Sequence, residues 1–453
     1  MRFDKVVRMN RRELLQAAPW AAGTLALLGN PVASLAALPG ARAPAPFARP
    51  LTRRWTEQRW VLDNLIQANG VDWDQPRTQY WNAACGLQAG PDFARIRERV
   101  HKYADIAPEF VDMARVREER ARAAETAGEL VSARENYFIA AVHWGAAQWP
   151  IDEANDQNRQ YNQRKRDCFT RYAGLADHHL ESVWIPFGDK ALPAWFHLPV
   201  GYDDGRVPVV VAIPGMDSFK EASVNLYGDP LLSRGIAVLA VDGPGQYECP
   251  LLGVYMTMEN WEVTGQACMN WLLRRPEADP GRISISGRSF GSFGATIAAS
   301  GEPRFRSIAV SATCFEPGFH SIFEEASPTF KMRFMFMANI ADETQFDAFM
   351  KTLTWEGQAE KIRMPFLCIA GAADELSPIE NTEHLFHTLT GPRQLVIYEE
   401  SRHSVGGGVS SALLGPNATD LSANWIAARF ASRPFSTERW FVDNGGKVAK
   451  TAL

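Results

Sequence analysis

The sequence has 453 residues, of which 46% are hydrophobic and 22% are charged. This composition is typical of a folded globular protein and excludes a disordered, collagen-like or coiled-coil chain. The 47 basic and 52 acidic side chains give a formal net charge of −5, which argues against nucleic-acid binding as the main role. A small-molecule partner fits this charge balance better.

Residues 1–43 have the features of a twin-arginine export signal followed by a spacer. Arg11 and Arg12 precede two leucines, an apolar stretch covers residues 17–28, and small residues follow it. The apolar stretch is shorter than the ~20 residues that a membrane span needs. The sequence therefore predicts recognition by the twin-arginine translocation machinery and a periplasmic or secreted mature protein without a membrane span. The alternative is a buried N-terminal helix in which the two arginines are incidental.

Residues 44–179 are predicted to form a helical N-terminal cap domain. Apolar side chains recur there at helical spacing, as in Leu130, Ala133, Tyr137, Ala140, Ala141 and Trp144. Good helix formers fill the positions between them. Pro108 and Pro150 mark expected helix boundaries.

Residues 180–435 are predicted to form an α/β domain with a mostly parallel central sheet. Short continuous apolar runs, separated by helical segments, are typical of strands buried on both faces. The expected strands are Val183–Phe187, Ala194–Leu198, Val209–Ile213, Ala237–Val241, Ile283–Ser286, Ile308–Ser311, Phe366–Ile369 and Leu395–Tyr398. Residues 436–453 are expected to be a C-terminal tail.

The six cysteines show no CxxC pair and no histidine at metal-ligand spacing. We therefore expect buried thiols and no metal site. A disulfide such as Cys85–Cys168 is left open by the sequence.

A G-x-S-x-G motif, Gly287 to Gly291, follows the expected strand Ile283–Ser286 and precedes a small-residue helix. A nucleophilic serine sits in this way on a strained strand-to-helix turn, where flanking glycines let strand and helix pass closely. The sequence therefore predicts that Ser289 is a catalytic nucleophile.

A serine nucleophile needs an imidazole base and a carboxylate that orients it. Asp374 follows the strand Phe366–Ile369, and His403 follows the strand Leu395–Tyr398. The order Ser, Asp, His is that of the α/β-hydrolase fold. Glu375 is the alternative orienting acid. The wide gap between Ser289 and Asp374 predicts a lid insertion at about 315–360.

An oxyanion hole needs two backbone N–H donors. One is expected from Phe290, which follows the nucleophile, and the other from the loop Pro214–Ser218. Met216 is the predicted second donor, with Asp217 next.

Ser218 and Glu221 stand at the S-x-x-E spacing of a helix capping box. In this motif both side chains bind backbone N–H groups at a helix N-terminus. We therefore expect a helix to begin here, and a structural role for both residues.

Together these motifs resemble the α/β-hydrolases typified by 2,6-dihydroxypseudooxynicotine hydrolase, related fungal polyketide-shortening hydrolases and the FrsA-like esterases. The resemblance covers roughly residues 110–432 and rests on P-G-M-D-S-F-K-E, D-G-P-G-Q, G-R-S-F-G and the Asp374 and His403 loops. It implies a helical domain that closes over the catalytic domain, no cofactor and often a homodimer. It also implies hydrolysis of esters or of carbon–carbon bonds next to ketones.

Two features depart from the family pattern. Ser292 stands where relatives commonly have a second glycine, and an export signal is unusual for an enzyme of intracellular catabolism.

For carbon–carbon cleavage, the resemblance suggests an additional acid from the lid. Glu324 and Glu325, together with Asp217, are the candidate substrate or lid acids; the alternative is that the lid acids cap or solvate a helix.

The predicted function is therefore hydrolysis of an ester or a ketone-activated carbon–carbon bond through an acyl-enzyme formed on Ser289. The expected substrate is an aromatic or polyketide-like small molecule. The alternatives are an exported peptidase and a noncatalytic binding protein on a hydrolase scaffold.

Overall fold

The computed structural model describes residues 51–405 and 414–452, and contacts group them into one compact unit. The predicted export signal at 1–43 lies outside the described residues. No helix in the described part of the chain has both the length and the apolar character of a membrane span.

The first described part of the chain is helical, as its apolar periodicity predicts. Thr52 begins the first helix by accepting a hydrogen bond from the Trp55 N–H at 3.1 Å. The fifth helix is buried along nearly its whole second half, so it forms the centre of this region and packs against its two sequence neighbours. The helices are α1 (Arg53–Asn69), α2 (Arg77–Cys85), α3 (Gly90–Arg99), α4 (Ile106–Thr126), α5 (Leu130–Gln148) and α6 (Asp156–Leu175).

A mixed, mostly parallel sheet of ten strands follows in the described residues, in the order β1-β2-β4-β3-β5-β6-β7-β8-β9-β10. The neighbouring strands from β4 to β9 in this order run parallel. The pairs β1-β2, β2-β4 and β9-β10 are antiparallel. The strands are β1 (Leu180–Phe187), β2 (Lys190–His197), β3 (Val207–Ile213), β4 (Ala237–Val241), β5 (Ala278–Arg288), β6 (Ile308–Ser311), β7 (Phe366–Gly371), β8 (Arg393–Tyr398), β9 (Glu438–Val442) and β10 (Val448–Ala452).

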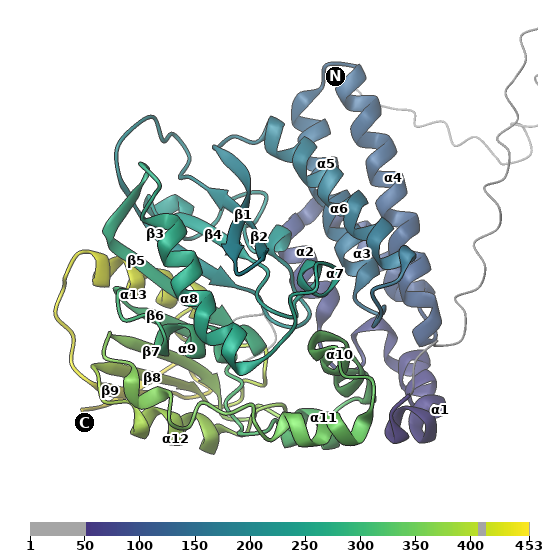
Figure 1. Ribbon diagram of the computed structural model, residues 1–453. Helices are drawn as coiled ribbons and strands as arrows, with labels where there is room; N and C mark the ends of the chain where they lie inside the picture. Colours follow the sequence, from purple (N-terminus) through teal and green to yellow (C-terminus); the bar gives the residue numbers. More distant parts are fainter. Residues whose placement is uncertain (1–50, 406–413, 453) are drawn as a thin grey trace, which may run out of the picture. The chain divides into compact units, whose positions relative to one another are not determined.

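Helices cover both faces of the sheet (Figure 1). Alternate residues of one strand belong to different cores: Val209 and Val211 pack with α8 (Met258–Leu272), α9 (Phe290–Ser300) and α12 (Ile379–Thr388). Val210 packs with α13 (Ala418–Phe430) on the opposite face. Because each strand is buried on both sides, its sequence is continuously apolar, which confirms the predicted α/β fold.

The segment between β6 and β7 contains a π-helix (Ser321–Glu325), α10 (Pro328–Ala338) and α11 (Glu343–Met350), at the position of the expected insertion. The chain end differs from the sequence expectation. Residues 436–453, predicted to be a tail, contribute β9 and β10 to the sheet edge. The side chains of β9 are mostly partly buried and those of β10 are mostly exposed, so these strands lack the continuous apolar run on which the prediction relied.

All six cysteines are buried and free. A disulfide between Cys85 and Cys168 is therefore not formed. Within the described ranges, no group of three or more His, Cys, Asp or Glu side chains is arranged to hold a metal ion.

Candidate active site

Ser289 lies on a sharp turn between β5 and α9. Its φ of +55° and ψ of −132° are strained for a residue with a side chain. A Cβ atom on Gly287 would overlap the carbonyl oxygen of Gly291, and one on Gly291 would overlap that of Ile213. The two motif glycines are thus required by close backbone packing, as the G-x-S-x-G pattern predicts.

Ser289, His403 and Asp374 form a continuous chain of hydrogen bonds. The Ser289 Oγ lies 2.7 Å from the His403 Nε2. On the other side of the ring, the His403 Nδ1 lies 2.9 Å from Asp374 Oδ2 and 3.1 Å from Asp374 Oδ1. The three residues follow the ends of β5, β8 and β7, so the parallel sheet brings them together.

The Asp374 carboxylate is itself held in place. Its Oδ1 accepts hydrogen bonds from the backbone N–H groups of Leu376, at 2.9 Å, and Ser377, at 3.1 Å. Glu375, the alternative orienting acid, is exposed. The structure therefore places Asp374, and not Glu375, against the imidazole.

The pKa of His403 reflects two opposing effects. Burial alone would lower it, but the Asp374 carboxylate, together with a smaller effect of Cys314, outweighs burial and raises the pKa well above its usual value of 6.5. A protonated imidazole is stabilised here, as a group that accepts a proton from a neighbouring hydroxyl requires.

Met216 and Phe290 both line the cavity beside Ser289. Among the described residues, neither backbone N–H has a hydrogen-bond acceptor. Gly215 lies so close to the serine that a Cβ added there would be 2.9 Å from the Ser289 Cβ. Two free N–H donors beside the hydroxyl are what an oxyanion hole needs.

Asp217 is engaged with the helical region through an arginine that sequence reasoning missed. The Arg77 Nε donates to Asp217 Oδ2 at 3.0 Å, and the Arg77 guanidinium also pairs with Asp74. The Arg77 side chain is fully buried, with its guanidinium 4.0 Å from the centre of the Trp149 ring. Burial alone would lower the pKa of Arg77, but the carboxylates of Asp217 and Asp74 outweigh burial and raise this pKa above its usual value.

The backbone of Asp217 is fixed as well. Its carbonyl oxygen accepts hydrogen bonds from the Trp81 Nε1 at 3.3 Å and from the Tyr247 hydroxyl at 3.2 Å. Asp217 follows Met216 directly, so these contacts hold the loop that carries the candidate oxyanion donor. We therefore interpret Asp217 as an anchor of this loop rather than as a free acid for a substrate.

The expected capping box at Ser218 and Glu221 is wrong. Only a short 3-10 turn, Lys220–Ala222, forms there. The fully buried Glu221 side chain instead accepts a hydrogen bond from the Trp195 Nε1 at 3.1 Å and pairs with Lys165 and Lys220. The Glu221 carboxylate neutralises these two buried lysines. The S-x-x-E spacing alone does not indicate such ion pairs.

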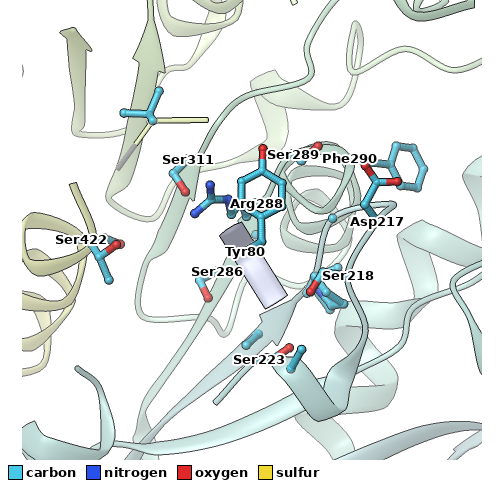
Figure 2. A pocket seen from close by; sticks show the side chains of 18 of the residues that line it. Tyr80, Asp217, Ser218, Ser223, Ser286, Arg288, Ser289, Phe290, Ser311 and Ser422 are labelled. Carbon is cyan, nitrogen blue, oxygen red and sulfur yellow. The ribbon is translucent and has the colours of Figure 1, made fainter. Parts of the chain in front are cut away.

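A cavity of about 630 Å³ opens beside Ser289 (Figure 2). Residues from both parts of the chain line it, including Tyr80 and Gln75 from the helical region. The Tyr80 hydroxyl donates to Gln75 Oε1 at 3.0 Å and also contacts the Ser404 hydroxyl, next to His403. Nothing in the local sequence around Tyr80 distinguished it from a core aromatic residue.

The lid acids do not reach this cavity, which corrects their expected role. Glu324 pairs with Lys331 at 2.7 Å, whereas the Glu325 side chain is 68% exposed and lies 3.4 Å from His320. Neither residue lines the cavity. Glu325 is a surface residue, as the alternative held, whereas Glu324 neutralises the buried Lys331.

Ser292, the departure from the family pattern, is buried at the start of α9. Its hydroxyl accepts a hydrogen bond from the Cys314 backbone N–H at 2.9 Å. The Cys314 sulfur lies 4.0 Å from the Ser289 hydroxyl. The additional hydroxyl therefore ties the first turn of α9 to the loop after β6.

The family model and the curated relatives agree on the class of protein. The family model described as FrsA-like esterase matches residues 106–361. The α/β hydrolase xenA of Xenoacremonium sinensis is 31% identical over 192 residues, which are 40% of this chain and 45% of that protein. Esterase FrsA of Vibrio vulnificus is 25% identical over 258 residues, which are 53% of this chain and 60% of that protein. The chain thus spans about half the length of the curated relatives it matches.

Among solved structures, the crystal structure of 2,6-dihydroxy-pseudo-oxynicotine hydrolase matches 78% of this chain and 96% of its own, with a TM-score of 0.66. The sequence identity is 19%, so this likeness is one of fold. A match of 78% of the chain is longer than residues 180–453 alone, so it includes part of the helical region as well as the sheet.

Proposed function

The chain belongs to the FrsA-like esterase family, and from this premise we propose that it is a serine hydrolase that works through an acyl-enzyme on Ser289. The observation that carries the proposal is the hydrogen-bonded chain from the Ser289 hydroxyl through His403 to Asp374. This series of hydrogen bonds ends on a serine with a strained backbone, at the wall of a cavity. A binding protein has no need of such strain.

In the proposed mechanism, His403 Nε2 removes the proton from Ser289 as its oxygen attacks a carbonyl carbon. The Met216 and Phe290 N–H groups hold the resulting oxyanion. His403 then gives the proton to the leaving group, and the acyl-enzyme forms. Water enters, loses a proton to His403, and releases the acid and the free serine.

Of the two proposed bonds, the residues of the cavity favour an ester. An alkoxide needs only the proton from His403 in order to leave, whereas a carbanion is far more basic and requires an additional acid. Of the candidate acids, Asp217 lines the cavity but is paired with Arg77, and Glu324 and Glu325 lie outside it. We therefore place ester hydrolysis before carbon–carbon cleavage.

A substrate panel tests this function. Purified protein is assayed with aryl esters, β-diketones and dipeptide amides, and we expect turnover of the aryl esters first. Turnover of the amides alone would favour an exported peptidase. Failure to hydrolyse any of the three, in a protein shown to be folded, would favour a binding protein on a hydrolase scaffold.

The pH dependence of the reaction provides a separate test. His403 accepts a proton only when neutral, so activity is lost as the pH falls through its raised pKa. Asp374→Asn removes the largest of the effects that raise this pKa, so burial, which lowers it, is then opposed only by the smaller effect of Cys314. We expect the acidic limb of the kcat/KM profile to move to lower pH, while the plateau falls on the order of 10,000-fold.

The exposed neighbour Glu375 offers a matched control for this change. Glu375→Gln should leave both the plateau and the acidic limb in place. An Asp374→Asn protein with wild-type activity, or with its acidic limb moved to higher pH, would contradict the proposed role of Asp374.

We also propose that the chain is exported through the twin-arginine pathway, on the basis of the sequence at 1–43. Replacement of both Arg11 and Arg12 by lysine is expected to retain the protein inside the cell. Fractionation of cells that express each form measures this. An unchanged distribution of the two forms would refute the proposed signal.

A further inference from the structure

Arg288 occupies the last position of β5, directly before the proposed nucleophile. It lines the same cavity as Ser289 and is only partly buried. Figure 2 shows its side chain beside the ring of Tyr80, with Ser286 and Ser311 nearby. The guanidinium carbon lies 5.3 Å from the centre of the Tyr80 ring. A cation is thus fixed one residue from the proposed reaction centre.

The other acidic and basic side chains of the cavity already have partners. Asp217 pairs with Arg77, and Asp229 Oδ1 accepts the backbone N–H groups of Leu231 at 2.8 Å and Leu232 at 3.2 Å. His403 is held between Ser289 and Asp374. In the described part of the chain, Arg288 has no acidic partner within ion-pair distance. Its positive charge is therefore available to a ligand.

Hydroxyl groups stand on the same cavity wall. Ser286 precedes Arg288 by two residues on β5. Ser311 lies opposite Arg288 on the neighbouring strand β6, and Ser422 comes from α13. Within the described ranges, none of these three hydroxyls has a hydrogen-bond partner in the protein. The wall therefore offers one planar cationic donor group and several free hydroxyl donors.

This donor set matches a carboxylate. A guanidinium presents two parallel N–H groups to the two oxygens of a carboxylate, and such charge-assisted pairs are stronger than neutral hydrogen bonds. The contact of the Arg288 guanidinium with the Tyr80 ring restrains the side chain, which reduces the entropy lost on binding. The apolar part of the lining, which includes Leu231 and Ile426, suits the hydrocarbon portion of the same molecule.

We propose that Arg288 binds a carboxylate of the substrate, so that the enzyme acts on esters that also carry a free carboxylate. This inference rests on the proposed function, because it assigns a substrate class to the Ser289 site. Arg288 is a specificity-determining residue in this proposal and takes no part in proton transfer.

Paired esters test the proposal through turnover. Hydrolysis of a 4-nitrophenyl half-ester of glutaric acid is compared with that of the matching neutral methyl glutarate ester, and 4-carboxyphenyl acetate is compared with phenyl acetate. Wild-type protein is expected to favour an anionic ester in at least one pair. Arg288→Gln should lower the anionic-to-neutral ratio of kcat/KM by about 10- to 100-fold, mainly through KM.

Two further variants sharpen this comparison. Arg288→Lys keeps the charge but loses the fork, so it should restore part of the ratio. Arg120→Gln removes an exposed arginine of α4 outside the cavity and should leave the ratio unchanged. A wild-type enzyme without preference in either pair, or an equal loss on both esters in Arg288→Gln, would overturn the proposal.

Binding to a protein that cannot turn over separates this inference from the proposed function. Ser289→Ala protein is titrated calorimetrically with the glutarate half-ester and with its neutral partner. Tighter binding of the anionic compound, lost in Ser289→Ala/Arg288→Gln, supports the subsite even if no ester is hydrolysed. Equal binding of the two compounds refutes the subsite, while leaving ester hydrolysis by Ser289 intact.

Discussion

Ser289→Ala is expected to lower kcat/KM for an aryl ester by on the order of 10,000-fold or more, because it removes the atom that forms the acyl-enzyme. The change deletes only a hydroxyl, whose hydrogen-bond partner is the His403 Nε2 at 2.7 Å. The strained φ of +55° at this position remains. Steady-state kinetics measures the loss, and a thermal unfolding curve shows that the protein is still folded.

A serine far from the cavity provides the matched control. Ser436 is exposed, and Ser436→Ala should retain wild-type kcat/KM. If Ser289→Ala kept activity within a few-fold of the wild type, either another nucleophile or direct attack by water would have to replace the acyl-enzyme. The proposed role of Ser289 would then be wrong.

Lys220→Met is expected to destabilise the protein by about 3–5 kcal/mol, because it leaves the buried Asp242 carboxylate without an ion-pair partner and takes one of the two cations from Glu221 and from Glu248. The Lys220 Nζ lies 2.7 Å from Glu248, 2.9 Å from Glu221 and 3.0 Å from Asp242. The lysine is only 3% exposed. Burial alone would lower the pKa of Lys220, but the three carboxylates raise it well above its usual value.

The same ion pairs connect the two parts of the chain. Lys165 of α6 lies 3.3 Å from Glu221, and Arg166 lies 2.8 Å from Glu248. Burial alone would raise the pKa of Glu221, but Lys165 and Lys220 lower it below its usual value. Loss of Lys220 therefore weakens the attachment of the helical region as well as the loop that follows Met216.

Equilibrium unfolding in urea, followed by tryptophan fluorescence, measures the cost of Lys220→Met. Lys351→Met is the control, since Lys351 is exposed at the end of α11, and its expected change is within about 0.5 kcal/mol. A loss of less than about 1 kcal/mol, the ordinary effect of a mutation, would contradict the prediction for Lys220→Met. It would show that methionine packs there without loss and that the carboxylates find other partners.

Local sequence signals were sufficient to predict the residues whose positions follow from a sharp turn or from the end of a buried strand. Ser289 is marked by two glycines that close packing requires, and Asp374 and His403 each follow a continuous apolar strand. Because parallel strands end at one edge of a sheet, these signals also predicted that the three side chains meet. Their distances agree with that expectation.

The residues whose roles were missed are positioned by contacts between segments that lie far apart in the sequence. Arg77 and Asp217 are 140 residues apart, and nothing near Arg77 indicates a partner in the loop after β3. Glu221 matched a capping box by spacing, but its neutralisation by Lys165 and Lys220 determines its place. Strands β9 and β10 escaped notice because they lie at the end of the sheet, where their side chains are not buried on both faces.

The central claim is that Ser289 is a covalent nucleophile, and the most direct measurement is the site of labelling by a fluorophosphonate. Folded protein is treated with the probe and digested, and the modified peptide is identified by mass spectrometry. We expect one adduct, on Ser289, which is absent from the Ser289→Ala and His403→Ala proteins. Labelling of a different residue, or no labelling of folded protein, would contradict the claim that Ser289 is the nucleophile.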